Sequence, residues 1–266
     1  MKFSMTTNAY DENQPIEARL RQFSDTGFRW IHWAEHLTSN KIYTRDEAER
    51  IAQMADKFNL CIDSIHGVYL LDEGRPFTED RWLKLNINRI QFISWLGGNC
   101  IVVHVPLEDC ELSFETECTQ SERLIRRILP AAQNHSVRLA IENLDTRSCR
   151  RIFDYLFKTF SQDDLGFCFD SGHAHMNGED DILERYLDRL RITHLHDNHG
   201  KEDEHLLPGA GTIAWKAVIS SLKKLPDLES VNIEAFWPGE IPKDQWCRMA
   251  YQSIFNLWYG NRRQNN

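Results

Sequence analysis

The stretch with the densest set of chemically active side chains is Ile192–Gly211, ITHLHDNHGKEDEHLLPGAG, which contains four histidines. Alternation places the side chains of His194 and His196 on one face of an expected strand. The loop that follows adds Asp203 and His205, two residues apart. Imidazoles and carboxylates are ligands for divalent metals, which need four or more donors. Further ligands must therefore come from other parts of the chain.

Such donors stand where successive expected strands end. In chain order they are His66, His104, Glu142, Asp170, the pair His194 and His196, and Glu234. Glu142 and Glu234 each follow four strand residues, where an unpaired charge would be costly to bury. A shared cation removes that cost, so we expect one divalent metal ion in a four-ligand site. Its expected ligands are Glu142, Asp170, His194 and Glu234.

Strands and helices are expected to alternate along the whole chain. The expected strands are Lys2–Thr6, Phe28–His32, Leu60–His66, Cys100–His104, Val137–Glu142, Gly166–Asp170, Ile192–His196 and Ser230–Glu234. The expected helices are Ile16–Ser24, Arg45–Phe58, Phe77–Leu96, Glu115–His135, Arg150–Thr159, Asp181–Leu190, Ile213–Leu225 and Asp244–Tyr259. Thr44 is the expected N-cap of the second helix, with Glu47 completing a capping box.

This alternation predicts an α/β fold, a single (β/α)8 TIM barrel over residues 1–266. A doubly wound open sheet is the competing fold. A barrel brings the carboxyl ends of all strands around one axis, whereas an open sheet spreads them along a line. Donors at six successive strand ends therefore favour the barrel.

Composition limits the classes of protein that fit. The 266 residues, 41% hydrophobic, can bury a large core. No apolar run is long enough for a membrane span, and the amino-terminal residues lack the apolar centre of a signal peptide, so we expect a cytoplasmic protein with no membrane partner. The seven cysteines contain no C-x-x-C pair and are expected to be reduced. The net charge of −9 argues against a broad nucleic-acid surface.

The chain resembles the xylose isomerase-like TIM barrel superfamily, which includes sugar and sugar phosphate isomerases and epimerases and the endonuclease IV type of abasic-site nuclease. The matching segments are SIHGVY, VVHVP, LAIEN, FDSGHAH, HLHDNHG, DEHLLPGAGTIAW and NIEAF. Together they cover nearly the whole chain and are specific, whereas each alone is weak. Ala214 departs from the aspartate that is common in the PGxGxIDW turn of the family.

The resemblance implies that Glu142, Asp170, His194 and Glu234 bind one manganese, magnesium, cobalt or zinc ion. The family spacing His-x-x-acid selects His194 over His196, although both side chains are expected to point inward. The nuclease branch binds three zinc ions, and its additional ligand positions also match here. Those positions are His66, His104, His173, Asp203 and His205.

The function expected first is a metal-dependent isomerase or epimerase of a small polyhydroxy carbonyl compound, a sugar or sugar phosphate. Glu142 and Glu234 would remove and return a proton through an enediolate that the metal stabilises. Residues expected to line the substrate pocket are Trp30, Trp33, Tyr69, Arg147 and Trp237, with His173, Asp203 and His205 orienting hydroxyl groups. Packing at the barrel mouth explains any single aromatic residue equally well.

The alternative is a zinc-dependent phosphodiesterase that acts on abasic DNA. Three clustered metals would generate hydroxide, and Tyr69 stands where that branch places a tyrosine in contact with DNA. The 40 acidic residues against 31 basic ones favour the small-molecule enzyme, because excess negative charge repels a phosphate backbone. A barrel that binds a sugar or a metal without turnover is a third possibility, and the two inward glutamates count against it.

Overall fold

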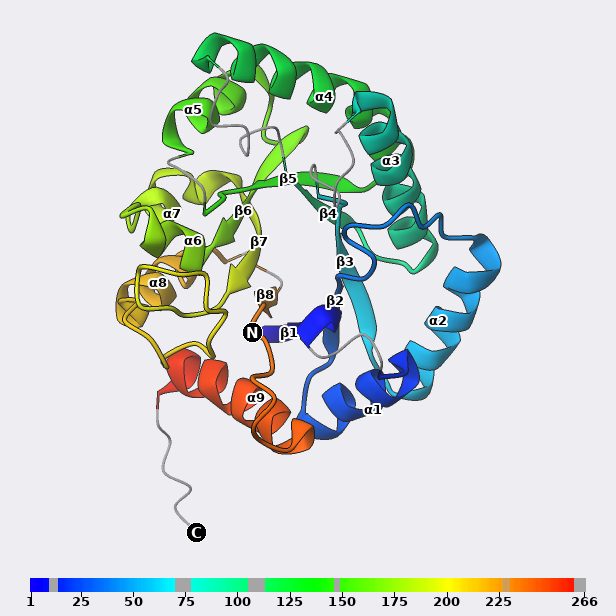
Figure 1. Cartoon of the computed structure of the whole chain (residues 1–266), viewed down its shortest axis with the longest axis vertical. Helices are drawn as coiled ribbons and strands as arrows, with labels where there is room; N and C mark the ends of the chain where they lie inside the picture. Colours follow the sequence, from blue (N-terminus) through cyan, green and yellow to red (C-terminus); the bar gives the residue numbers. More distant parts are fainter. Residues whose placement is uncertain are drawn as a thin grey trace.

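Eight parallel strands form a closed barrel in which each strand pairs with the next along the chain and β8 pairs with β1 (Figure 1). The computed structural model describes residues 1–9, 14–69, 78–104, 113–145, 149–226, 228 and 230–260. The strands are β1 Lys2–Thr6, β2 Trp30–Trp33, β3 Cys61–His66, β4 Cys100–Val103, β5 Arg138–Glu142, β6 Leu165–Asp170, β7 Leu190–Leu195 and β8 Ser230–Ile233. The expected (β/α)8 barrel is confirmed.

The helices surround the barrel in chain order (Figure 1). They are α1 Ile16–Thr26, α2 Arg45–Lys57, α3 Glu79–Trp95, α4 Phe114–Asn134, α5 Arg150–Thr159, α6 Ser171–Met176, α7 Ile182–Arg185, α8 Trp215–Leu222 and α9 Lys243–Tyr259, with short 3-10 helices at Thr7–Ala9 and Leu187–Arg189. None of these helices is both long and apolar enough to cross a membrane, within the residues that the structure describes.

The interior of the barrel is separate from the larger core between strands and helices. Its apolar residues are Cys100, Val102, Ala140, Cys168 and Ile192. Because strand side chains alternate, residues two positions further along share this inward face. Glu142, Asp170 and His194 stand at those positions. The strand period therefore directs the expected donors to the barrel axis at its carboxyl end.

Two local differences from the expected elements affect the site. The segment Ser171–Met176, which lies between the expected strand and the expected helix, forms helix α6, and the carboxylate of Asp170 caps it by accepting the backbone N–H of His173 at 2.8 Å. Strand β7 begins at Leu190 rather than at Ile192, because the expected helix before it is broken into α7 and a 3-10 turn. His173 is consequently held on a helix instead of a loop.

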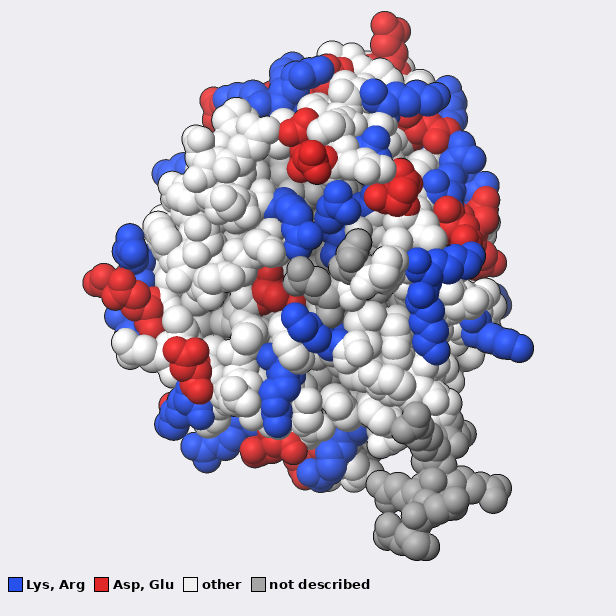
Figure 2. Space-filling model, turned by 180° about the vertical axis from the view of Figure 1, so that it is seen from behind, with Lys and Arg blue, Asp and Glu red and all other residues white. Residues whose placement is uncertain are grey.

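The outer faces of the helices carry charges of both signs. Pairs one helical turn apart, such as Arg45 with Glu49 and Arg126 with Glu122, join residues of the same helix. On the face shown in Figure 2, basic and acidic side chains are mixed around the rim, and several basic ones lie near the middle. The net charge of −9 is therefore not gathered into one acidic surface on this face.

Candidate metal centre

Four of the expected ligands come together at the carboxyl ends of neighbouring strands. Glu142 ends β5, Asp170 ends β6, His194 lies in β7, and Glu234 directly follows β8. One ligand atom from each residue lies within 4.8 Å of those of the other three, and all four residues are buried. The spacing in sequence is large, but the barrel register makes these strands neighbours, with Asp170 paired to His194.

The imidazole of His194 lies between two carboxylates. Its Nδ1 is 2.8 Å from Oε1 of Glu142 and 2.8 Å from Oε2 of Glu234. Burial alone raises the pKa of both glutamates, but His194, joined at Glu142 by His104 and His66, more than offsets this, so both pKa values are lowered. Burial lowers the pKa of His194, while Cys168 and the two glutamates raise it, and the net pKa is well above its usual value.

This arrangement fits a divalent cation. A single nitrogen can donate one proton to one carboxylate at a time, yet Nδ1 of His194 faces two oxygens at the same short distance. Three buried carboxylates, Glu142, Asp170 and Glu234, meet one imidazole in this group. A cation in contact with all four residues would compensate the excess negative charge, and this mixed oxygen and nitrogen set suits Mn, Co, Mg or Zn.

Glu142 also faces a second group of donors. Its Oε2 lies 3.2 Å from Nε2 of His66 and 3.0 Å from Nε2 of His104. Nδ1 of His66 donates to the backbone carbonyl of Gly67 at 2.8 Å, which orients the ring so that Nε2 faces this group. Glu142 is therefore shared, one oxygen facing His194 and the other facing His66 and His104.

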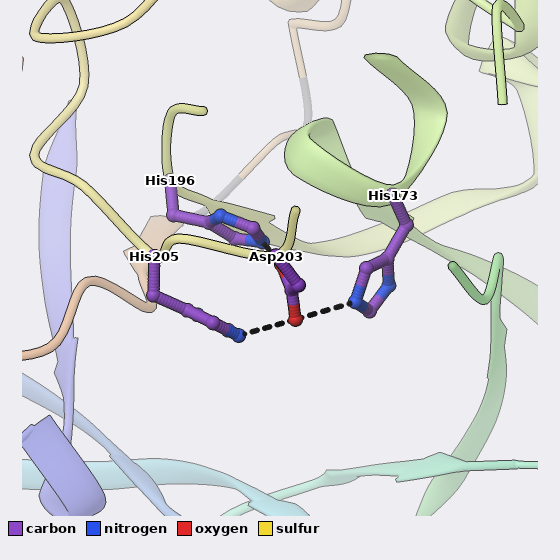
Figure 3. Close-up of side chains that lie close together, drawn as sticks. All are labelled: His173, His196, Asp203 and His205. Atoms are coloured by element: carbon purple, nitrogen blue, oxygen red, sulfur yellow. Dashed lines mark hydrogen bonds and ion pairs between the residues drawn. The ribbon is translucent and has the colours of Figure 1, made fainter. Parts of the chain in front are cut away.

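A third group lies beside the first and is shown in Figure 3. It consists of His173 on α6, His196 just after β7, and Asp203 and His205 in the loop before α8. Oδ2 of Asp203 lies between Nε2 of His173 at 3.3 Å and Nε2 of His205 at 2.8 Å (Figure 3). His196 connects this group to the first, since its Nε2 is 3.0 Å from Oδ1 of Asp170.

Backbone carbonyls orient the two outer imidazoles of the third group. Nδ1 of His173 donates to the carbonyl of Asn143 at 2.9 Å, and Nδ1 of His205 donates to the carbonyl of Glu234 at 2.6 Å. Metal-binding histidines typically use such a bond to fix the tautomer that offers the other nitrogen. Asp203 raises the pKa of His205 to about 9, against the opposing effect of burial. The imidazoles of His173 and His205 are thus oriented as those of metal-binding histidines typically are.

The two inward-pointing histidines, His194 in β7 and His196 just after it, belong to different ligand groups. His194 joins Glu142, Asp170 and Glu234, whereas His196 contacts Asp170 and stacks on His205 with ring centroids 4.0 Å apart. The sequence-based choice of His194 for the four-ligand group thus agrees with the grouping seen here. Whether any of these residues binds a metal remains a prediction.

The residues expected to line the pocket are placed differently from one another. Tyr69 lies at the site, with its ring stacked on His104 at 5.1 Å. Trp33 was expected there wrongly: it points outward from β2, packs against Phe92 of α3 and is 3% exposed. Trp30 begins β2 at the opposite end of the barrel, where Lys2 lies over its ring.

The contacts found for Trp237 within the described residues involve no member of the three ligand groups. Its indole N–H donates to the carbonyl of Ile241, its backbone N–H donates to Ala9, and Lys243 lies over its ring. Arg147 lies outside the described residues, so its expected role stays a prediction.

Two residues at the site were not expected. Phe236 stacks on His205 with ring centroids 3.9 Å apart and is 39% exposed, so it forms a partly open wall beside the third group. His32 is fully buried with its ring 5.0 Å from that of His194. Burial and the neighbouring imidazoles lower its pKa well below the usual value. Its position at the end of an expected strand, as for the other donors, was the signal that could have identified it.

Asp197 holds the loop that carries the third group. Its carboxylate accepts the indole N–H of Trp215 at 2.6 Å and the backbone N–H groups of Gly209 and Ile213 at 2.9 and 3.1 Å. A fully buried carboxylate with these donors is a structural anchor. The acid of HLHD therefore shapes the loop instead of belonging to any of the candidate ligand groups.

We compared the chain with protein-family models, with known sequences and with solved structures. The model of the xylose isomerase-like TIM barrel family matches residues 20–251. The y4fM protein of Sinorhizobium fredii is 30% identical over 256 residues, covering 85% of this chain and 82% of that protein. Inosose isomerase of Bacillus licheniformis is 25% identical over 151 residues, which cover 52% of this chain and 54% of that enzyme.

Solved structures share the fold at lower identity. The IOLI protein, whose crystal structure contains a bound zinc atom, has a TM-score of 0.79 at 16% identity and covers 97% of this chain and 98% of its own. The barrel, the converging strand-end donors and the family model agree. The chain belongs to the xylose isomerase-like TIM barrel family.

Proposed function

We propose that this chain is a divalent-metal-dependent isomerase or epimerase of a sugar or sugar phosphate. The observation that carries the proposal is the pair of buried glutamates, Glu142 and Glu234, on either side of Nδ1 of His194. A site for binding alone would not require two inward carboxylates in addition to Asp170. Inosose isomerase, a relative by sequence, gives further support.

The chain's own groups supply the proton chemistry. In the metal-free protein both glutamates have lowered pKa values, because the charged imidazole of His194, together with His104 and His66 beside Glu142, favours their ionised forms; a bound cation would favour the same ionised forms. A cation held by Glu142, Asp170, His194 and Glu234 would supply Lewis-acid polarisation of a substrate carbonyl. A weak carboxylate base moves a carbon-bound proton efficiently only when it is held in contact with it, which the rigid strand ends achieve. One glutamate would remove the proton and the other would return it.

Deuterium incorporation tests this proposal. The protein is incubated with manganese and a panel of ketoses and ketose phosphates in deuterated water, and label at the carbon next to the carbonyl is measured by NMR. We expect label in at least one substrate and none with Glu142→Gln. Glu49→Gln, which changes an exposed glutamate of α2, is the matched control. Label in no substrate with the parent protein, or equal labelling with Glu142→Gln, would contradict the proposal.

A second candidate function is a zinc phosphodiesterase acting on abasic DNA. The specific observation in its favour is that the three ligand groups described above, two of which share Glu142, lie side by side among the described residues. This function would be supported by a zinc content of about three ions per chain in elemental analysis, together with salt-dependent cleavage of an abasic duplex. One ion per chain and no cleavage would support the isomerase instead.

A further inference from the structure

The second ring nitrogen of His194 has no hydrogen-bond partner within the part of the chain that the structure describes. Nδ1 faces Glu142 and Glu234, so Nε2 points away from the ligand group into the barrel, where the residue is 0% exposed. If Nδ1 is to bind a cation, it must be unprotonated, and Nε2 then carries the proton. Metal-binding histidines almost always donate that proton to a neighbouring group.

His32 is placed to receive it. Its ring centroid lies 5.0 Å from that of His194, and its Nε2 is likewise buried without a partner among the described residues. Nδ1 of His32 is 2.9 Å from Oγ of Ser64, whose proton goes to Oδ1 of Asp63 at 3.0 Å. Since Ser64 has donated its proton, its oxygen accepts from Nδ1–H of His32. The Nε2 of a neutral His32 is therefore an acceptor.

We infer that His32 is a positioning residue of the metal centre: its Nε2 accepts, through one bridging water molecule, the proton on Nε2 of His194, and thereby holds Nδ1 of His194 ready for the cation. This inference rests on the metal centre of the proposed function, but not on the reaction. Asp63, Ser64 and His32 form a chain of hydrogen bonds from β3 to β2, and the ring of His32 lies beside that of His194 on β7.

The surroundings can also hold a bridging water. The side-chain amide of Asn232 and the hydroxyl of Ser4 are buried and have no partner among the described residues. Asn232 is paired in register with both His194 and Ser4, so these side chains lie at one level of the barrel interior. A buried water needs two to four polar partners, which this set provides.

Three substitutions at one position separate this role from simple packing. His32→Phe keeps a ring of similar size but removes the acceptor. The glutamine of His32→Gln has an amide oxygen that can take the place of Nε2. The asparagine of His32→Asn is shorter, so its amide reaches only the position of Nδ1. We expect His32→Phe and His32→Asn to weaken zinc binding about 10- to 100-fold, as for other groups that orient metal ligands, and His32→Gln to restore most of the affinity.

The measurement is the zinc dissociation constant by chelator competition, with thermal unfolding of the metal-free proteins to check folding. In the zinc-loaded parent, two-bond ¹H–¹⁵N NMR should find the proton of His194 on Nε2. Should His32→Phe not fold, Ser64→Ala gives the same test more mildly, because it frees His32 to take the other tautomer.

Equal zinc affinity of His32→Phe and the parent, or equal losses in His32→Gln and His32→Asn, would overturn the inference. A parent that binds no zinc would overturn both this inference and the metal centre. Normal zinc binding with the expected order of variants, but no deuterium exchange, would support the inference and count only against the proposed function.

Discussion

Replacing Gly172 by alanine should disrupt the connection between the first and third ligand groups. Gly172 lies in α6, and a Cβ added there would be 1.9 Å from Cε1 of His196 and 2.5 Å from its Nδ1. The imidazole can retreat only by displacing other rings, because it stacks on His205 at 4.0 Å, which in turn stacks on Phe236 at 3.9 Å. The substitution must therefore move His196 or the start of α6.

The size of the effect follows from opposing contributions. Alanine in place of glycine within a helix normally stabilises by about 1 kcal/mol. Overpacking of a rigid core costs about 1 to 3 kcal/mol. Displacing His196 also loses its hydrogen bond to the carboxylate of Asp170, worth about 1.5 to 3 kcal/mol for a charged partner. We expect Gly172→Ala to lower the free energy of unfolding by about 3 kcal/mol.

A double-mutant cycle with His196→Ala tests this reasoning. Without the imidazole, the added methyl group has space, so the cost of Gly172→Ala should disappear or become a gain of up to about 1 kcal/mol. Urea unfolding of the metal-free parent, both single variants and the double variant gives the coupling energy. Additive effects would show that His196 is not what excludes a side chain at position 172, and the packing argument would fail.

Three other predictions concern the loop and the number of ions. In the metal-free protein His205, whose pKa is raised to about 9, contributes stability that is fully present below its unfolded pKa of about 6.5 and is lost as pH rises through about 9. Urea midpoints across this range should therefore fall for the parent more than for His205→Asn, which tolerates the positive φ of 46°. Asp197→Asn should cost about 2 to 4 kcal/mol in urea unfolding, because its amide N–H2 would face N–H donors, while the exposed Asp188→Asn should change little. Deuterium exchange measured against added zinc should reach a maximum and then decline if further ions engage His66 and Glu142; exchange that stays at its maximum would contradict this.

The sequence was sufficient to predict the barrel and the positions of the main donors. The strand period places Glu142, Asp170 and His194 on the inward face, and a closed barrel makes strand ends neighbours whatever their separation in sequence. The cap of α2 was also readable, since Thr44 accepts the backbone N–H of Glu47 at 3.3 Å. These features depend on local pattern and on topology, which the sequence expresses directly.

Features that depend on side-chain direction were harder to predict. Trp33 follows His32 by one residue, so a shift of one position decides which of them faces the barrel interior, and the aromatic residue was chosen wrongly. The same one-residue ambiguity applies just after β8, where Trp237 was expected at the site but Phe236 stacks on His205. Helix α6 has only six residues, too few for a periodic signal, and only the capping carboxylate of Asp170 marks its start.

The two candidate functions make incompatible demands on Glu142. As a proton acceptor it needs an oxygen that can reach the substrate, and Oε1 already faces His194 in the four-ligand group. Its remaining oxygen, Oε2, lies 3.0 Å from Nε2 of His104 and 3.2 Å from Nε2 of His66. A second cation held by His66, His104 and Glu142 would engage this side of the carboxylate as well, so Glu142 would be less able to accept a proton. The number of ions at work therefore decides between proton transfer and hydrolysis, because the same carboxylate cannot serve both.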